Sequence, residues 1–343
     1  MLREGKALNK AVSKQNTKIQ NRKGKMKNLE AVIKKYLKNV ADAAKGTGPI
    51  RAAVMAGRKK IYCVLARESG GNVEYFDTLS ADIDDDLYNV ENGIHDGIEQ
   101  IRVNIAAFAV KINMEYAVIN IVLPDPVSAL SVFNPGSHAA MAAKRDILRL
   151  KSSGKIGVAQ DKISFFMPES KSAVLETDSF AFSSKKVYTE TMRGFLHDAQ
   201  LAPSSSAPGI SYIYDAFSEQ LSGTKGAIFL VEPEYWTFYL WGSGGRPAYM
   251  ISRWFEAGII NAAALKDAVS EVERKLRAYS VSNKGVEIDT FYAAGAGRFA
   301  AEAAGLIRER FNCGCVELVM PGTGTSEKLN ALPVSLIAAA GSR

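Results

Sequence analysis

Apolar runs separated by turn residues open both halves of the chain. In the first half, three such runs are broken by a single glycine and by a Gly-Gly pair, and they cover residues 51–56, 60–67 and 73–79. In the second half, a Glu-Pro-Glu turn and a Gly-Ser-Gly-Gly turn divide the runs 226–231, 235–241 and 248–254. Short β-prone runs between such turns predict strands. Each half is therefore expected to begin with a three-stranded β-meander.

Segments with helical periodicity alternate with further strands after each meander. Apolar residues recur at intervals of three and four, which predicts helices over 82–105, 137–150, 185–199, 213–221, 261–279 and 298–311, and a last one from about residue 331. Strands are expected at 116–123, within 155–182, at 289–293 and at 316–320. The run 116–123 is almost wholly apolar, as expected of a strand that is covered on both faces. This alternation indicates an α/β fold.

A change of composition divides the chain near residue 205. The segment 203–209 reads Pro-Ser-Ser-Ser-Ala-Pro-Gly, a cluster typical of a loop or linker. We therefore predict a first lobe over 49–205 and a second lobe over 206–330. Both lengths fall within the usual range of single domains.

Positive charge is concentrated in the first 48 residues. They hold thirteen Lys and Arg against three acidic residues, whereas the whole chain has a net charge of +7, so the remaining 295 residues are slightly acidic. Residues 1–27 are polar and lack apolar periodicity, which predicts a mobile basic arm. Residues 28–48 show an amphipathic pattern that predicts a basic helix, with Lys34, Lys35 and Lys38 on its polar face.

This basic helix leaves three alternatives open. Lys34, Lys35 and Lys38 could contact an anionic membrane surface, or the helix could bind nucleic acid or pack against the domain behind it. The acidic remainder offers no second basic surface, so nucleic acid is not expected as a partner. No apolar run approaches the roughly 18 residues of a membrane-spanning helix, and no secretory leader is recognisable, so we expect a cytoplasmic location. Three cysteines form no paired framework and three histidines are far apart, so no metal site is expected.

The strand expected at 235–241 is rich in aromatic residues. Alternation would place Tyr235, Tyr239 and Trp241 on one face and Trp236 and Phe238 on the other. If no helix covers the second face, Trp236 and Phe238 form a docking surface for a partner, because exposed aromatic rings supply much of the binding energy at interfaces. Burial of both faces in the core is the alternative.

Three local sequences narrow the fold within the α/β class. Residues 119–125 read Ile-Asn-Ile-Val-Leu-Pro-Asp, and this strand end resembles the one found in PilM-like proteins. Residues 179–202 resemble a strand–helix segment of these proteins, and the ending Leu-Ile-Ala-Ala-Ala-Gly-Ser-Arg at 336–343 resembles their short terminal helix. From residue 50 onward, the chain therefore resembles the PilM/GspL-type assembly proteins of type IV pili and type II secretion, which have the actin-like ATPase fold.

This resemblance implies a duplicated, ribonuclease H-like α/β fold of two lobes, each with a β-meander plus helices. It also implies a small subdomain inserted in the first lobe at about 127–183 and a terminal helix, 331–343, that returns to the first lobe. The inserted subdomain would hold a short cytoplasmic peptide of a bitopic inner-membrane protein, and the body would link that protein to the motor ATPase of the machine. The chain would thus be a scaffold, peripheral at the inner membrane, with anionic lipid as a further contact of the basic arm.

Members of this family hold a nucleotide between the lobes with three loops. The first aligns with residues 55–59, Met-Ala-Gly-Arg-Lys, which keep the glycine but have Met55 where an acidic residue orients Mg²⁺. The second aligns with residues 231–234, Val-Glu-Pro-Glu, in which proline lacks an amide N–H and two carboxylates would repel phosphate. The third, which holds adenosine, aligns with residues 294–297, Ala-Gly-Ala-Gly.

The resemblance therefore implies a vestigial nucleotide cleft with candidate contacts at Gly57, Lys59, Gly295 and Gly297. Because only one loop of the three is intact, binding of ATP and Mg²⁺ is disfavoured, no catalytic residue is assigned, and the chain is not expected to be an enzyme. The alternative is an active actin-like ATPase or a sugar-kinase-type phosphotransferase. That alternative requires the loops to bind Mg-ATP despite Met55 and the Glu-Pro-Glu turn.

Overall fold

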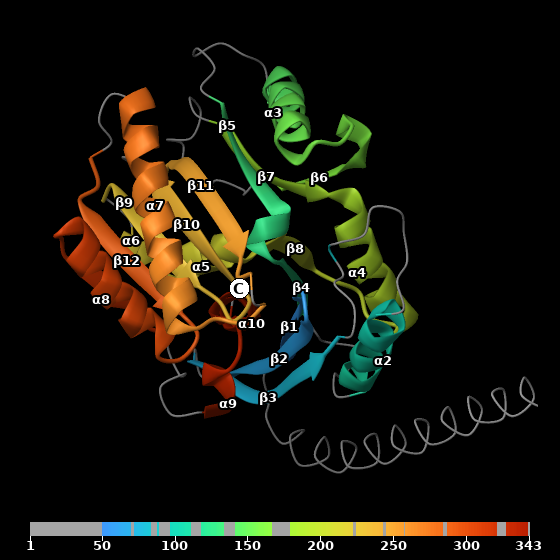
Figure 1. Cartoon of the computed structure of the whole chain (residues 1–343). Helices are drawn as coiled ribbons and strands as arrows, with labels where there is room; N and C mark the ends of the chain where they lie inside the picture. Colours follow the sequence, from blue (N-terminus) through green and yellow to red (C-terminus); the bar gives the residue numbers. More distant parts are fainter. Residues whose placement is uncertain are drawn as a thin grey trace, which may run out of the picture.

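Two five-stranded mixed sheets, one in each half of the chain, form the framework of the molecule (Figure 1). This computed structural model describes residues 50–69, 72–83, 88, 97–110, 118–133, 141–166, 179–221, 224–242, 245–256, 258–283, 287–320 and 327–341. The predicted basic arm (1–27) and basic helix (28–48), with Lys34, Lys35 and Lys38, lie outside the described residues.

The first sheet has the strand order β3-β2-β1-β4-β8. Its strands are β1 (Ile50–Ala56), β2 (Lys60–Ser69), β3 (Asn72–Asp82), β4 (Val118–Leu123) and β8 (Ser205–Pro208). β1, β2 and β3 pair antiparallel, which confirms the first predicted meander, and β4 and β8 run parallel to β1. β8 lies within the segment 203–209, so the prediction that this segment is a linker is wrong for these four residues.

The second sheet repeats this plan in the order β11-β10-β9-β12-β13. Its strands are β9 (Gly226–Val231), β10 (Tyr235–Trp241), β11 (Pro247–Trp254), β12 (Thr290–Gly295) and β13 (Cys315–Leu318). Again the first three strands pair antiparallel and the last two run parallel to the first. Because both sheets have the same order and directions, the predicted duplicated α/β fold is confirmed.

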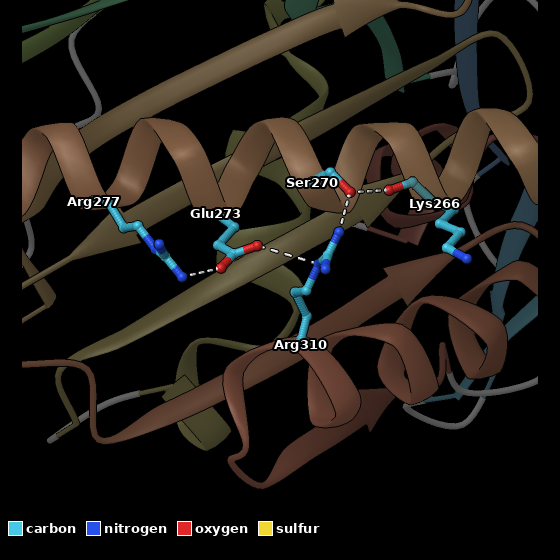
Figure 2. Close-up of polar contacts among 5 residues, drawn as sticks. All are labelled: Lys266, Ser270, Glu273, Arg277 and Arg310. Carbon is cyan, nitrogen blue, oxygen red and sulfur yellow. Dashed lines mark hydrogen bonds and ion pairs between the residues drawn. The ribbon is translucent and has the colours of Figure 1, made fainter.

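Helices cover the outer face of each sheet. The first sheet is covered by α2 (Gly97–Ala109) and α4 (Lys186–Asp198), and the second by α7 (Ala262–Ser282) and α8 (Phe299–Phe311). α7 begins after the N-cap Asn261, whose side chain accepts a hydrogen bond from the Ala264 N–H. Arg310 of α8 donates to Ser270 Oγ at 2.7 Å and pairs with Glu273 at 3.2 Å, so polar contacts also join α8 to α7 (Figure 2).

The two inner faces share one hydrophobic core, which we call the shared core. It contains Ala53 and Met55 of β1 together with Ile228 and Leu230 of β9, whereas their neighbours in sequence face the outer helices. Two helices complete it, α5 (Gly209–Ala216) and α10 (Val334–Gly341), and the short helices next to them in the chain are α6 (Ser218–Leu221) and α9 (Glu327–Asn330). α10 lies against β1, β2 and β4 as well as α5, so the last described helix packs on the sheet of the first lobe.

A third, antiparallel sheet is inserted between β4 and β8 in the chain. Its order is β5-β7-β6, and its elements are β5 (Ser128–Phe133), β6 (Ile163–Phe166) and β7 (Ser179–Lys185), the helix α3 (Met141–Ile156) and the 3-10 turns η1 (Asp125–Val127) and η2 (Gln160–Lys162). α3 packs on one face of this sheet. We call residues 128–185 the insert, which Figure 1 shows at the top of the molecule with α3 outermost.

Several helix boundaries differ from the predictions. β3 continues to Asp82, so the helix predicted over 82–105 cannot begin there, and its described part starts at Gly97. The described part of α3 starts at Met141, and the helix continues beyond its predicted end at 150, through Gly154 to Ile156, because packing on the third sheet outweighs the low helix propensity of glycine. The helix predicted over 213–221 already begins at Gly209.

Among the described residues, none of the helices combines the length and apolar content of a membrane span.

Candidate functional site

The β1–β2 turn and the β9–β10 turn, which align with two of the nucleotide loops, touch each other across the lobes. Both carboxylate oxygens of Glu234 accept hydrogen bonds from the β1–β2 turn, Oε2 from the Arg58 N–H at 2.9 Å and Oε1 from the Lys59 N–H at 2.6 Å. Gly57 leaves room for this contact, because a Cβ there would lie 1.7 Å from Glu234 Oε2. The Arg58 and Lys59 amides, in the loop that aligns with the first nucleotide loop, thus donate to a side chain of the loop that aligns with the second.

Two further carboxylates join the lobes at fully buried positions. Glu232 accepts hydrogen bonds from the first two amides of α10 at 2.8 and 2.9 Å. Asp125, just after β4, accepts one from the Ile210 N–H of α5 at 3.0 Å and one from the Thr237 hydroxyl of β10 at 2.8 Å. Each carboxylate therefore meets the N-terminus of a helix, where the helix dipole favours a negative charge.

Burial gives these two carboxyl groups an unusual affinity for protons. Desolvation raises the pKa of Asp125 to about 7, although hydrogen bonds from Ile210 and Thr237 oppose the rise. Desolvation also raises the pKa of Glu232 to about 7, and the charge of Asp125 adds to this rise. The described residues contain no group of His, Cys, Asp and Glu side chains arranged to hold a metal ion. In the structure, these two carboxyl groups accept hydrogen bonds from backbone N–H groups and from the Thr237 hydroxyl.

The glycines of the third loop lie against the protein's own backbone. A Cβ at Gly295 would lie 2.8 Å from the Val231 carbonyl oxygen, and one at Gly297, which has φ of +53°, would lie 3.1 Å from the Asn330 carbonyl oxygen of α9. Of the four predicted nucleotide contacts, the structure brings two together at Glu234. The other two, Gly295 and Gly297, lie at the β12–α8 connection, where the close packing accounts for both of them.

The aromatic strand alternates as predicted, but both of its faces are buried. Tyr235, Tyr239 and Trp241 belong to the shared core. Trp236 and Phe238, only 3% and 1% exposed, pack in the core between the second sheet and its outer helices. The structure therefore corrects the prediction that Trp236 and Phe238 form a partner-binding surface, because α7 and α8 cover that face.

A groove of about 580 Å³ separates the insert from the first lobe. It is lined by Ser164, Phe165 and Phe166 of β6, Phe182 of β7, Thr189 and Arg193 of α4, Ser205, Ser206 and Ala207 of β8, and Ser211, Tyr212 and Asp215 of α5. One wall is aromatic, and the opposite wall along β8 consists of small residues. Sequence reasoning missed this groove, because its lining comes from five elements that are far apart in the chain.

Two of the strands that line this groove are end strands of their sheets, β6 of the third and β8 of the first, whereas β7 is the central strand of the third. Within the described part of the chain, no strand pairs with the outer edges of β6 and β8. Thr189 adds a hydroxyl group that is buried and has no hydrogen-bond partner among the described residues. Unpaired strand edges and a buried, unsatisfied hydroxyl are features that a bound peptide backbone can satisfy.

The opposite edge of the insert is closed. Lys151 and Lys155 of α3 reach over β5 and donate to the carbonyl oxygens of Val132 at 3.0 Å and Leu130 at 2.5 Å. A helix or charged side chains that cover a strand edge hinder the addition of another strand. Of the two edges of the third sheet, the one in the groove is therefore the edge suited to peptide binding.

Comparison with known proteins gives matches only among solved structures. No protein-family model matches the sequence, and no curated protein matches it either. A chain of the PilM–PilN type IV pilus biogenesis complex is similar with a TM-score of 0.62 and 12% identity, over 85% of this chain and 99% of that chain. The identity is low, so this likeness concerns the fold.

Two further structures have lower scores. A protein of unknown function with an actin-like ATPase fold from Bacteroides thetaiotaomicron has a TM-score of 0.49 and 8% identity, over 86% of this chain and 97% of that chain. The cytoplasmic domain of EpsL, an inner-membrane component of the type II secretion system of Vibrio cholerae, has a TM-score of 0.45 and 10% identity, over 86% of this chain and 96% of that chain. The repeated five-stranded sheets and the likeness to the chain of the PilM–PilN complex give the chain the predicted actin-like ATPase fold, and the predicted resemblance to PilM is confirmed at the level of the fold.

Proposed function

We propose that the chain is a non-catalytic scaffold of an inner-membrane assembly platform, like those of type IV pili or type II secretion, and that it binds a membrane protein through an extended peptide. The observation that carries this proposal is the groove between β6 and β8, in a fold similar to that of a chain in the PilM–PilN complex. The protein would lie in the cytoplasm, peripheral at the inner membrane. It would link a bitopic membrane protein to the motor ATPase of the machine, and its basic arm would add contact with anionic lipid.

The groove defines the chemistry of the peptide. A strand added to β6 or β8 would form backbone hydrogen bonds with the free edge, which supply affinity, while alternate side chains enter pockets, which supply specificity. Phe165 and Phe166, both half-buried, favour apolar side chains on one side of the peptide. The exposed guanidinium group of Arg193 favours an Asp or Glu side chain of the peptide near it. We therefore expect an extended segment of alternating character with an acidic position.

The contacts of the three loops that align with the nucleotide loops support a role without catalysis. An actin-like fold is shared by enzymes and scaffolds, so function must be argued from the site. In this chain, the amides of the first nucleotide loop bind Glu234, and the glycines of the third loop pack against backbone. The alternative of an ATPase or sugar-kinase-type phosphotransferase predicts tight Mg-dependent binding of a fluorescent ATP analogue, and titration of the full chain tests it.

Site-specific photocrosslinking tests the groove. A photoreactive amino acid placed at Ser164 of β6 lies in the groove, and the same residue placed at Arg145, exposed on α3, serves as the matched control. Each full-length variant is mixed with detergent-solubilised membranes of the source organism and irradiated. We expect the Ser164 variant to capture one bitopic membrane protein, with the crosslink in its cytoplasmic segment.

The control decides the interpretation. A product that forms equally at Arg145, or a Ser164 variant that captures no membrane protein, would show that the groove is not the binding site. A crosslink that maps to a folded domain rather than to an extended segment would contradict the peptide mode.

A further inference from the structure

The carboxylate of Glu234 binds two backbone amides of the β1–β2 turn in the other lobe. We propose that Glu234 is an internal substitute for a phosphate group, whose carboxylate fills the amide site of the β1–β2 turn and holds the two lobes together without a nucleotide. This inference concerns the contact between the β1–β2 turn and the β9–β10 turn and is independent of the groove that carries the proposed function.

The carboxylate accepts hydrogen bonds from the turn in the way that a phosphate group would. Two successive N–H groups, of Arg58 and Lys59, donate one to each carboxylate oxygen. Successive backbone N–H groups in a turn form the concave sites that bind phosphate in other proteins. The turn is closed by a hydrogen bond from the Gly57 N–H to the Lys60 carbonyl at 2.7 Å. Arg58 and Lys59, which supply these two amides, are basic residues and add positive charge to the turn, whereas Lys60 pairs with Asp82 at 3.5 Å.

Glu234 is held in position by its own lobe. A backbone hydrogen bond of 2.9 Å from Glu232 to Tyr235 closes its turn, and the Phe255 N–H donates to its carbonyl oxygen at 2.9 Å. Pro233, directly before it, has a fixed φ. Because the backbone on both sides is anchored, the carboxylate reaches the other lobe with little loss of conformational freedom. Glu234 is 4% exposed, so water screens the contact poorly.

A free phosphate cannot replace this carboxylate while it is present. The entering anion would have to displace Glu234, whose carboxylate occupies both amide donors and is 4% exposed, and two like charges in one buried position repel strongly. Removal of the Glu234 carboxylate leaves the two amide donors of Arg58 and Lys59 at the vacated position. That position is then suited to phosphate.

Hydrogen exchange of the full chain at single-residue resolution tests this inference. The amides of Arg58 and Lys59 are followed in the wild type, in Glu234→Ala and in Glu234→Gln, with and without inorganic phosphate. Glu256→Ala is the matched control, because Glu256 is an exposed acid close in sequence to Phe255. We expect exchange to be roughly tenfold faster in Glu234→Ala, the factor for loss of one charge-assisted hydrogen bond. Phosphate should restore protection in that variant and change neither the wild type nor the control.

The variants separate a phosphate substitute from an ordinary contact. If Glu234→Ala leaves the two amides protected, the carboxylate does not hold the turn and the inference is wrong. If protection is lost but phosphate does not restore it, Glu234 joins the lobes without standing in for phosphate, and the inference is equally wrong. Should Glu234→Ala fail to fold, Glu234→Gln is judged by the protection of the two amides alone, because its side chain still fills the position. It keeps the size and one acceptor oxygen but loses the charge, and wild-type protection of both amides would contradict the inference. The crosslink at Ser164 is expected to be the same in all variants that fold.

Discussion

The buried carboxyl group of Asp125 predicts that the protein loses stability as the pH rises through neutrality. Asp125 is fully buried, and its pKa rises from 3.8 to about 7 in the folded chain. The folded state therefore binds a proton more tightly than the unfolded state does. This group stabilises the fold fully below about pH 4, and its contribution disappears as the pH rises through about 7. Glu232, with its pKa raised from 4.5 to about 7, acts in the same direction.

The magnitude follows from the size of the shift. One unit of pKa corresponds to about 1.4 kcal/mol, so a group with these values contributes about 2 to 3 kcal/mol less at pH 8 than at pH 5. Asp125→Asn removes this titration. The amide oxygen still accepts from the Ile210 N–H, and the Thr237 hydroxyl can turn toward Ser252 Oγ, which lies 2.9 Å away. We expect the variant to have a flatter dependence of the free energy of unfolding on pH.

Urea denaturation at pH 5, 6, 7 and 8 and constant ionic strength measures this dependence. The wild type, Asp125→Asn, Glu232→Gln and the control Asp146→Asn, at an exposed position on α3, are compared. The control should follow the wild type, whereas each buried variant should lose about 2 kcal/mol of the change between pH 5 and 8. The reasoning is refuted if the wild type gains stability with rising pH, or if Asp125→Asn keeps the full pH dependence.

Substitutions at three further positions, Gly57, Glu273 and Asn261, test contacts of the fold. Gly57→Ala should cost about 2 to 4 kcal/mol, because a Cβ would lie 1.7 Å from Glu234 Oε2 and displace the carboxylate. In a Glu234→Ala background the same change should cost under about 1 kcal/mol, and equal costs in urea denaturation would contradict the contact. Glu273→Ala should cost about 1 kcal/mol or less in low salt, with most of the effect lost in 1 M salt. Asn261→Ala should cost about 1 kcal/mol through loss of the bond to the Ala264 N–H, whereas Asn261→Asp should leave the midpoint of thermal unfolding nearly unchanged.

The strands that could be predicted are those with a strong local pattern. β9 and β10 are apolar runs of six and seven residues with turns at both ends, and both appear at the predicted bounds. β8 could not be predicted, because it has four residues and includes Pro208. Its strand geometry depends on parallel pairing with β4, from Asn120 and Ser205 to Leu123 and Pro208, and no local propensity reveals such pairing.

In the candidate site, too, the residue types could be predicted but their partners could not. The sequence indicates that residues 231–234, which align with the second nucleotide loop, carry two carboxylates, and the structure shows these side chains in hydrogen bonds across the lobes. Their partners could not be predicted, because Glu234 and Arg58 are 176 residues apart, and Glu232 and Val334 are 102 residues apart. The position of Asp125, between two prolines after an apolar strand, could have marked it as a functional residue. That pattern is also typical of an ordinary strand end, so it does not identify a site.

The shared core implies that neither lobe can melt by itself. Separation of the sheets would expose Met55 on one side and Leu230 on the other, and would leave α10, a nearly uncharged helix, facing water. The two halves, although duplicated in plan, therefore constitute one cooperative unit. Heating or denaturant should produce a single transition, seen alike by tryptophan fluorescence from the second half and by helix content from the whole chain.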